Sequence, residues 1–540
     1  MFRRPLALVT LLGLLLAACG GSAATTTATK SGSASGATAA ASTAPKVLTI
    51  AYTDDPTSLD PQKTPSVGLV HSLIYDTLVV QGADLQYHPD LATSWTIAPD
   101  GKSITFQLRK DVTFSDGTPF NADAVKFTFD RLLDPKTASP GKSFLGTLTS
   151  TTVVDPYTVR LDFSAPYAPI FNSLSTDFCA IISPTAVQKE GDSFGQQPVG
   201  TGPFIFKNWA KGQSITLEKN PNYKWGPYYY SNPGPAQYDQ IVFKELPEEN
   251  TRVLALKSGE VQISDVPATS LSVIQSDPNI NLVKTQSQGV TYLGFNVSRA
   301  PWNDPKVRQA IAHLIQRDPI VQVGLGGLGV PQFTPIPTNV WGFDQSVADQ
   351  EYNYDPAAAK SILESDGYTP GSDGIMTKGG KPLSMEILTY TTQPYPRVAQ
   401  VVQNQIQAGG IQVTIKTLEA ASLLALTPTG NFDSILIAYG WSDPDILYYF
   451  FDSANLKTSN RVHLTDPSVD ALLLKGRTTV DPTARAAVYK DLQQTIDQLA
   501  PWIPLYSIVS ETGISKSVAG VQILPSGTML LLDAHPASGS

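Results

Sequence analysis

The segment from Leu383 to Ile415 constrains the fold of this chain more than any other stretch. Two alternating apolar runs, each typical of a strand, flank a helical stretch that begins near Pro396 and ends at Gly409-Gly410. The two runs are Leu383, Met385 and Ile387, and then Ile411, Val413 and Ile415. A strand, a helix and a second strand in this order predict a parallel strand pair with a crossover helix, so we expect an α/β fold.

Strand and helix patterns recur along the rest of the chain. Alternating apolar residues predict strands from Leu48 to Tyr52 and from Ile104 to Leu108. Helices are expected directly after residues that commonly cap or begin a helix, which are Asn121, Asp304-Pro305, Asp355-Pro356 and Asp481-Pro482. Gly200 and Gly202 are expected to supply backbone angles that are closed to other residues.

The N-terminal residues predict export from the cytoplasm. A basic head is followed by an apolar run from Leu6 to Ala17 and by Cys19. The run is about a dozen residues long, whereas a membrane-spanning helix needs roughly 20, so we interpret residues 1–19 as a signal peptide. Residues 20–46 consist mainly of Gly, Ala, Ser and Thr, which predicts a disordered tether.

Leu16-Ala17-Ala18-Cys19 resembles the bacterial lipobox. This resemblance implies that Cys19 becomes the new N-terminus after cleavage and carries a diacylglyceryl lipid, which would anchor the protein to a membrane. The alternative is a secreted protein whose Cys19 is removed with the signal peptide.

The composition is typical of a globular protein and excludes several functional classes. Of 540 residues, 41% are hydrophobic and 16% are charged, and the net charge of -9 gives no reason to expect nucleic acid as a partner. A lipid on Cys19 would leave Cys179 without a disulfide partner. The five histidines lack the spacing of zinc ligands, so we expect no metal site and no cofactor besides the lipid. The sequence contains no G-x-S-x-G, Walker A or H-E-x-x-H motif, and we expect no enzyme activity.

Several ordered motifs resemble one protein family. They are the runs from Pro89 to Trp95 and from Val112 to Val125, followed by Pro198 to Phe204, Gly440 to Asp445 and Ile503 to Tyr506. In this order they resemble the family 5 extracellular solute-binding proteins, the peptide and nickel receptors of ABC importers. The resemblance covers almost all of the chain from Val47 onwards.

This resemblance implies a two-lobed periplasmic-binding-protein type II fold of cluster C. Lobe I would comprise residues 47–295 and 501–540, with an extra subdomain at about 86–185, and lobe II residues 296–500. Two crossover segments would join the lobes, and a solute, expected to be a peptide or a peptide-like molecule, would lie between them. The protein would be an extracytoplasmic monomer, on the periplasmic or outer face of the cell membrane, that delivers its solute to an ABC permease.

Other functions remain open at this point. The same fold could bind an oligosaccharide, an opine-like compound or a metal chelate. An anchored envelope hydrolase with dispersed carboxylates, or a sensor or chaperone on this fold, are further alternatives.

The segment Trp441-Ser442-Asp443-Pro444-Asp445 carries the first set of predicted solute contacts. In peptide-binding members of the family, an aspartate a few residues after a lobe II tryptophan pairs with the amino terminus of the peptide. This chain lacks the intervening residues, so Asp443 either contacts solute or caps the helix that follows it. Trp441 either stacks on solute or packs under the loop, and Tyr439 ends the preceding strand.

Two further loops are expected to contact solute. Asp54, Asp55 and Ser58 follow the first strand, where either aspartate could pair with a cation or Asp55 could form a turn with Pro56. Tyr390 and Tyr395 follow a lobe II strand and would suit amphipathic solutes.

Overall fold

The computed structural model describes residues 44–349 and 352–538. Pro45–Ser540 form one compact unit. The predicted lipidation residue Cys19 and nearly all of the predicted tether lie outside the described residues. Within the described ranges, no helix is long and apolar enough to cross a membrane.

The compact unit is built on a sheet of 12 strands among the described residues. Its continuous path is β19 (Gln412–Leu418), β18 (Ser384–Tyr390), β20 (Ser434–Gly440), β13 (Gly289–Phe295), β21 (Trp502–Ser515), β11 (Ile263–Val266), β1 (Val47–Tyr52), β10 (Gln240–Glu245), β9 (Ser214–Lys219) and β8 (Phe204–Ala210). Two more strands, β12 (Ile280–Gln286) and β14 (Gly329–Pro331), pair with β21. Parallel and antiparallel pairs both occur, which confirms an α/β protein with a mixed sheet.

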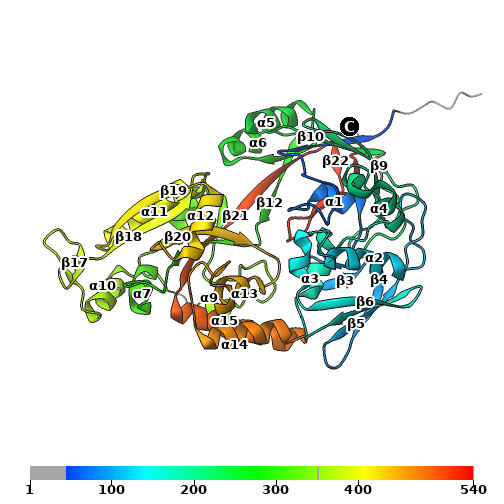
Figure 1. Ribbon diagram of the computed structural model, residues 1–540. Helices are drawn as coiled ribbons and strands as arrows, with labels where there is room; N and C mark the ends of the chain where they lie inside the picture. The colour runs from blue at the N-terminus through cyan, green and yellow to red at the C-terminus, as the bar shows by residue number, and fades with distance from the viewer. Residues whose placement is uncertain (1–43, 350–351, 539–540) are drawn as a thin grey trace, which may run out of the picture. The chain divides into compact units, whose positions relative to one another are not determined.

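Strand β21 joins the two halves of this sheet (Figure 1). Its first residues pair with β13, where Trp502 lies opposite Gly294, and its last residues pair with β11 and β12. Buried apolar side chains form separate clusters on either side of it. One cluster draws on residues 48–263 and 514–534, and two others draw on residues 290–506.

The predicted strand, helix and strand between Leu383 and Ile415 are confirmed. Strand β18 pairs in parallel with β19, with Ser384 opposite Gln412, and α11 (Tyr395–Ala408) connects them. The apolar side chains of α11 that face the sheet, such as Val398 and Val402, are buried. Burial of this face stabilises the helix, as expected for a crossover helix in an α/β sheet.

The predicted helix starts are also confirmed. The Asn121 side chain accepts a hydrogen bond from the backbone N–H of Ala124, and equivalent caps come from Asp304, Asp355 and Asp481. The helices that follow are α2 (Ala122–Leu133), α7 (Pro305–Ala312), α10 (Pro356–Ser365) and α15 (Pro482–Leu499). Among the described residues, the other α-helices with at least five residues are α1 (Leu69–Ile74), α3 (Ile170–Leu174), α4 (Pro184–Glu190), α5 (Glu249–Ser258), α6 (Leu271–Gln275), α12 (Ala420–Leu426), α13 (Ile446–Phe451) and α14 (Pro467–Thr478).

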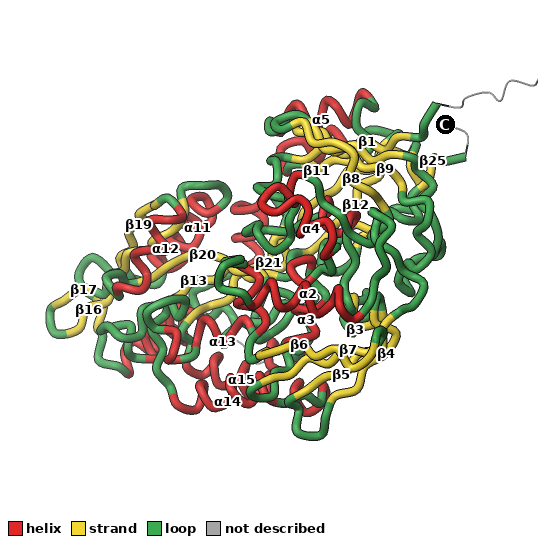
Figure 2. Tube along the Cα trace, turned by 45° about the vertical axis from the view of Figure 1, so that its right-hand side comes forward, coloured by secondary structure: helices red, strands yellow, loops and turns green. Residues whose placement is uncertain are grey.

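A second sheet of four strands lies between β1 and β8 in the sequence. Its antiparallel strands are β4 (Ala92–Ile97), β5 (Ser103–Leu108), β7 (Thr158–Phe163) and β6 (Leu148–Asp155), in that order. Helix α2 packs against β6 and β7, and α3 lies beside the same sheet (Figure 2). Phe106 and Phe129 of this region belong to the same apolar cluster as Leu48 of β1, so the second sheet is packed onto the first half of the main sheet.

The explanation predicted for Gly200 and Gly202 is wrong. Neither glycine has the positive φ that other residues avoid. Both are instead needed because the chain passes very close to the end of α1. A Cβ on Gly202 would lie 2.5 Å from the carbonyl carbon of Ile74, and a Cβ on Gly200 would lie 2.2 Å from the oxygen of that carbonyl.

Candidate functional site

A cavity of about 560 Å³ lies beside the end of α1. Residues from the segments 67–77, 80–90, 175–177, 203–230 and 524–529 line it, and Ser442 contributes from the loop after β20. The volume falls in the range of roughly 300–1,000 Å³ that is usual for small-molecule sites. Because the lining comes from both halves of the main sheet, this cavity is the candidate solute site.

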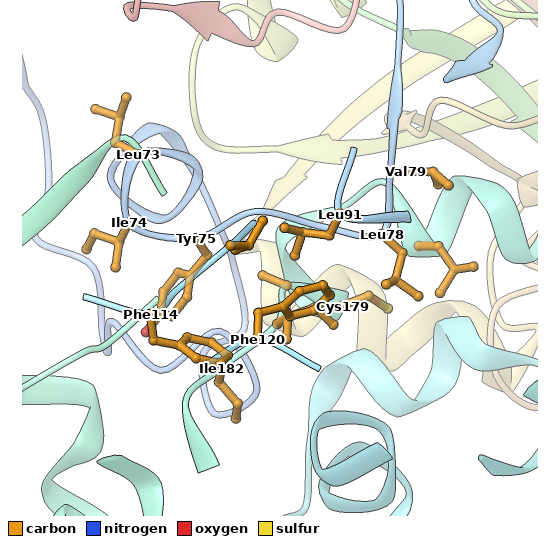
Figure 3. Close-up of a cluster of buried hydrophobic side chains, with 14 of the residues drawn as sticks. Leu73, Ile74, Tyr75, Leu78, Val79, Leu91, Phe114, Phe120, Cys179 and Ile182 are labelled. Carbon is orange, nitrogen blue, oxygen red and sulfur yellow. The ribbon is translucent and has the colours of Figure 1, made fainter. Parts of the chain in front are cut away.

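The segment from Tyr75 to Leu78 forms one wall of the cavity. Figure 3 shows its apolar side chains packed with Leu91, Phe120 and other buried residues, and Tyr75, Leu78 and Leu91 are at most 1% exposed. The same segment carries two polar residues, Asp76 and Thr77, which line the cavity. Packing of the apolar neighbours therefore holds the Asp76 carboxylate in a fixed place.

Each carboxylate oxygen of Asp76 accepts a hydrogen bond. The hydroxyl of Tyr223 donates to its Oδ1 at 3.1 Å, and Nε1 of Trp225 donates to its Oδ2 at 3.0 Å. Burial raises the pKa of Asp76, and these two donors act in the opposite direction. The side chains of Tyr223 and Trp225 therefore hold the Asp76 carboxylate in the wall of the cavity.

Asp90 and Asp177 line the same cavity with fewer partners. Oδ2 of Asp90 accepts a hydrogen bond from the backbone N–H of Thr77 at 3.1 Å, while its buried Oδ1 has no partner within the described part of the chain. Burial, together with the charge of Asp76, raises the pKa of Asp90 well above its usual value. The same two causes raise the pKa of Asp177 to about 7.

The loop after β20 approaches this region from the other half of the sheet. The Trp441 ring lies 4.5 Å from the ring of Phe144, and the Ser442 hydroxyl donates a hydrogen bond to Oδ1 of Asn172. In α14, outside this loop, the Arg477 carbonyl accepts a hydrogen bond from the backbone N–H of Ala168 at 2.8 Å. The contacts of Trp441 and Ser442 hold the loop against the region that contains the second sheet and place Ser442 at the cavity.

Asp443 is buried in an ion pair. Its side chain is 2% exposed, and the guanidinium of Arg485 donates to both carboxylate oxygens, at 2.9 Å and 2.7 Å. Oδ1 also accepts a hydrogen bond from the backbone N–H of Asp445 at 2.8 Å. Arg485 thus compensates the negative charge of Asp443. The two hydrogen-bonded side chains stabilise the turn that precedes α13. A solute contact by Asp443 stays a prediction.

Three other predicted contact residues, Trp441, Tyr439 and Asp55, also have protein partners. Trp441 packs on Phe144, as described above, and the Tyr439 hydroxyl donates to the Pro335 carbonyl. Asp55 accepts hydrogen bonds from the Tyr52 hydroxyl and, at 2.7 Å, from the backbone N–H of Gly212.

The loop after β1 and the tyrosines of β18 and α11 complete the predicted set. Ser58 Oγ accepts a hydrogen bond from the backbone N–H of Asp60 at 3.1 Å, and Asp54 is exposed. The rings of Tyr390 and Tyr395 meet edge to face at 4.9 Å. The structure brings Tyr390 and Tyr395 together, but none of the eight predicted residues lines the cavity.

The cavity residues were missed by the sequence analysis, although one signal for them exists. Asp76 lies inside an otherwise apolar run from Leu73 to Val79 that is interrupted further only by Thr77. A carboxylate in such a run is forced into the interior, where it needs donors or a function. Asp177 has no comparable signal, because its place at the cavity depends on how distant segments pack.

Comparison with known proteins identifies the family. The family model described as bacterial extracellular solute-binding proteins, family 5 middle, matches residues 86–459. The chain belongs to this family. It is therefore an extracytoplasmic, non-enzymatic substrate-binding protein of an ABC importer, and the alternative of an envelope hydrolase is wrong.

Individual relatives support the same assignment. The glutathione-binding protein GsiB of Escherichia coli (strain K12) is 30% identical over 497 residues, which cover 89% of this chain and 93% of that protein. Among solved structures, NikA from Brucella suis in complex with Fe(III)-EDTA has a TM-score of 0.79 at 27% identity and covers 91% of this chain and 100% of that chain. DppA from Helicobacter pylori in complex with the peptide STSA has a TM-score of 0.69 at 29% identity and covers 90% of this chain and 98% of that chain. The fold of this solute-binding protein is thus the α/β periplasmic-binding-protein fold of these structures.

Proposed function

We propose that this solute-binding protein captures a peptide or peptide-like small molecule in the cavity beside α1 and delivers it to an ABC permease. The observation that carries the proposal is the lining of the cavity. Five segments of the first half of the chain and of its C-terminus face Ser442, which follows β20 in the other half. A solute that contacts both sides would favour the arrangement in which they are close together.

The proposed architecture is the two-lobed, type II fold of cluster C. Lobe I would comprise residues 47–295 and 501–540, lobe II residues 296–500, and the four-stranded sheet would belong to an extra subdomain at about 86–185. The separate apolar clusters on either side of β21 support this division, because each lobe then has its own core. The crossover segments would lie near residues 296 and 501, and the protein would act as a monomer.

The nature of the solute is inferred from relatives that differ in what they bind. GsiB is named for glutathione, and the DppA structure holds the peptide STSA, which favours a peptide-like solute. The NikA structure holds Fe(III)-EDTA, so a non-peptide solute such as a metal chelate, an oligosaccharide or an opine-like compound is the alternative.

Attachment to the membrane completes the proposal. A diacylglyceryl group on Cys19 would hold the protein at the membrane surface, because two or more acyl chains anchor a protein durably. Residues 20–46 would then act as the tether of the compact unit.

The experiment that tests the function is native mass spectrometry of the protein purified from its own host. We expect a small molecule bound in a one-to-one ratio and released unaltered on denaturation. A strain that lacks the protein should then lose uptake of that molecule. Uptake that continues at the wild-type rate would contradict the proposal.

A further inference from the structure

The charges that face the cavity have one sign. Three carboxylates line it, those of Asp76, Asp90 and Asp177, whereas no Lys, Arg or His is found among the lining residues of the described chain. Arg109 is the guanidinium whose charge acts on both Asp76 and Asp90, but it forms its own ion pair with Asp111 at 3.0 Å and does not line the cavity. The carboxylates therefore lack a direct cationic partner from the protein.

The hydrogen-bonding state of Asp90 also indicates an absent partner. Its side chain is 4% exposed, and Oδ1 has no donor within the described residues, although Oδ2 is held by Thr77. A buried carboxylate oxygen without a donor is costly. Among the described residues, the causes that raise the pKa of Asp177 are burial and the charge of Asp76, and they include no hydrogen bond and no cation. A donor with positive charge in the cavity would satisfy both groups.

Aromatic rings also line the cavity. Tyr75, Tyr223, Tyr229 and Tyr230 line the cavity, and the last two meet at 4.9 Å between ring centroids. The face of an aromatic ring attracts organic cations, and cages of aromatic side chains recognise quaternary ammonium ligands. In the described part of the chain, no three His, Cys, Asp or Glu side chains are grouped to hold a metal ion, which favours an organic cation over a bare metal ion.

We propose that the cavity binds the ammonium group of a cationic organic solute, with Asp90 and Asp177 as its contacts and the tyrosine rings around it. This inference rests on the proposed function and specifies the solute class. It also places the cation on the lobe I side of the site, because the carboxylate of Asp443 in the lobe II loop is already paired with Arg485.

The test uses two pairs of probes in which one member carries an ammonium group and the other lacks it. One pair is choline and its analogue of the same shape with a neutral tert-butyl group in place of the trimethylammonium group. The other pair is the dipeptide methionyl-leucine and its analogue with hydrogen in place of the ammonium group. Isothermal titration calorimetry of the purified protein should show that at least one ammonium probe binds about tenfold or more tightly than its analogue.

Three variants assign this discrimination to the cavity. Asp90→Asn keeps an acceptor for the Thr77 N–H but removes the charge, and Asp177→Asn removes a charge at a partly exposed residue that folding tolerates more readily. Both should lose the preference for the ammonium probe. Asp123→Asn, at an exposed residue of α2, is the matched control and should keep it.

Several outcomes would overturn the inference that the cavity binds an ammonium group. It is wrong if the analogues without the ammonium group bind as tightly as the probes that carry it, if neither ammonium probe binds at millimolar concentration, or if Asp90→Asn and Asp177→Asn both discriminate like the wild type. A molecule without an ammonium or other cationic group in the native mass spectrum would also refute it, while leaving solute capture intact. The proposal of solute capture is contradicted only if a strain without the protein still takes up the solute at the wild-type rate.

Discussion

At the scale of single residues, Asp443 and Arg485 form a buried ion pair whose loss should lower stability strongly. Both side chains are at least 94% buried, since their exposed fractions are 2% and 6%. Asp443→Ala leaves the guanidinium buried without its carboxylate, and we expect a loss of about 3–5 kcal/mol in the free energy of unfolding. Urea denaturation measures this loss.

An exposed ion pair provides the control for that variant. Arg160 and Asp162 are 43% and 27% exposed, so Asp162→Ala should cost less than about 1 kcal/mol. An Asp443→Ala protein that unfolds at the wild-type urea concentration would show that the buried pair contributes nothing. Solute affinity of the same variant, measured below its unfolding transition, tests the predicted solute contact.

Asp177 gives a prediction about pH. Its pKa in the folded protein is raised to about 7, first by burial and then by the charge of Asp76. The folded state therefore binds a proton that the unfolded state has released between about pH 4 and pH 7, so this group lowers stability as the pH rises through that window. Asp177→Asn should gain stability relative to the wild type from pH 4 to pH 7, as measured by urea denaturation at several pH values. A difference that stays constant with pH would contradict the shift.

At the scale of elements, the close approach of the segment 198–204 to the end of α1 shapes the cavity wall. In Gly202→Ala the new Cβ would meet the backbone of Leu73 and Ile74 at 2.7 Å and 2.5 Å, so one of the two segments must move. We expect a loss of about 1–3 kcal/mol in thermal or urea unfolding, together with weaker solute binding.

The matched control for this variant is Gly440→Ala. A Cβ at Gly440 would have its nearest contact at 3.7 Å, which is an ordinary van der Waals distance. If the Gly202→Ala and Gly440→Ala proteins unfold alike, the close approach is not what requires glycine at residue 202.

Local signals predicted the elements well, but they could not predict the site. Helix caps such as Asn121 and the alternating run before α11 act through neighbours in sequence, and these predictions are confirmed. The cavity instead combines Asp76, Asp177 and Ser442, which come together only when the two sheets and the loop after β20 pack. The family motif around Asp443 predicted a solute contact in that loop. In the structure, Arg485, which lies far along the chain, forms an ion pair with this aspartate.

At the scale of the whole molecule, anchoring by lipid gives a separate prediction. Cys19→Ser should remove the site of lipid attachment, so the protein should no longer enter the detergent-rich phase in a detergent phase separation. Cys179→Ser is the matched control, since Cys179 is a buried free thiol of the compact unit. Continued partitioning of the Cys19→Ser protein into detergent would refute lipid attachment at this residue.

The central claim is that a solute lies in the cavity beside α1. A crystal structure of the protein purified with its own solute tests this claim most directly. We expect density for the solute between Asp90 on one side and Ser442 on the other, with the solute chemically intact. Density for the solute at any other place, with water alone in this cavity, would contradict the claim.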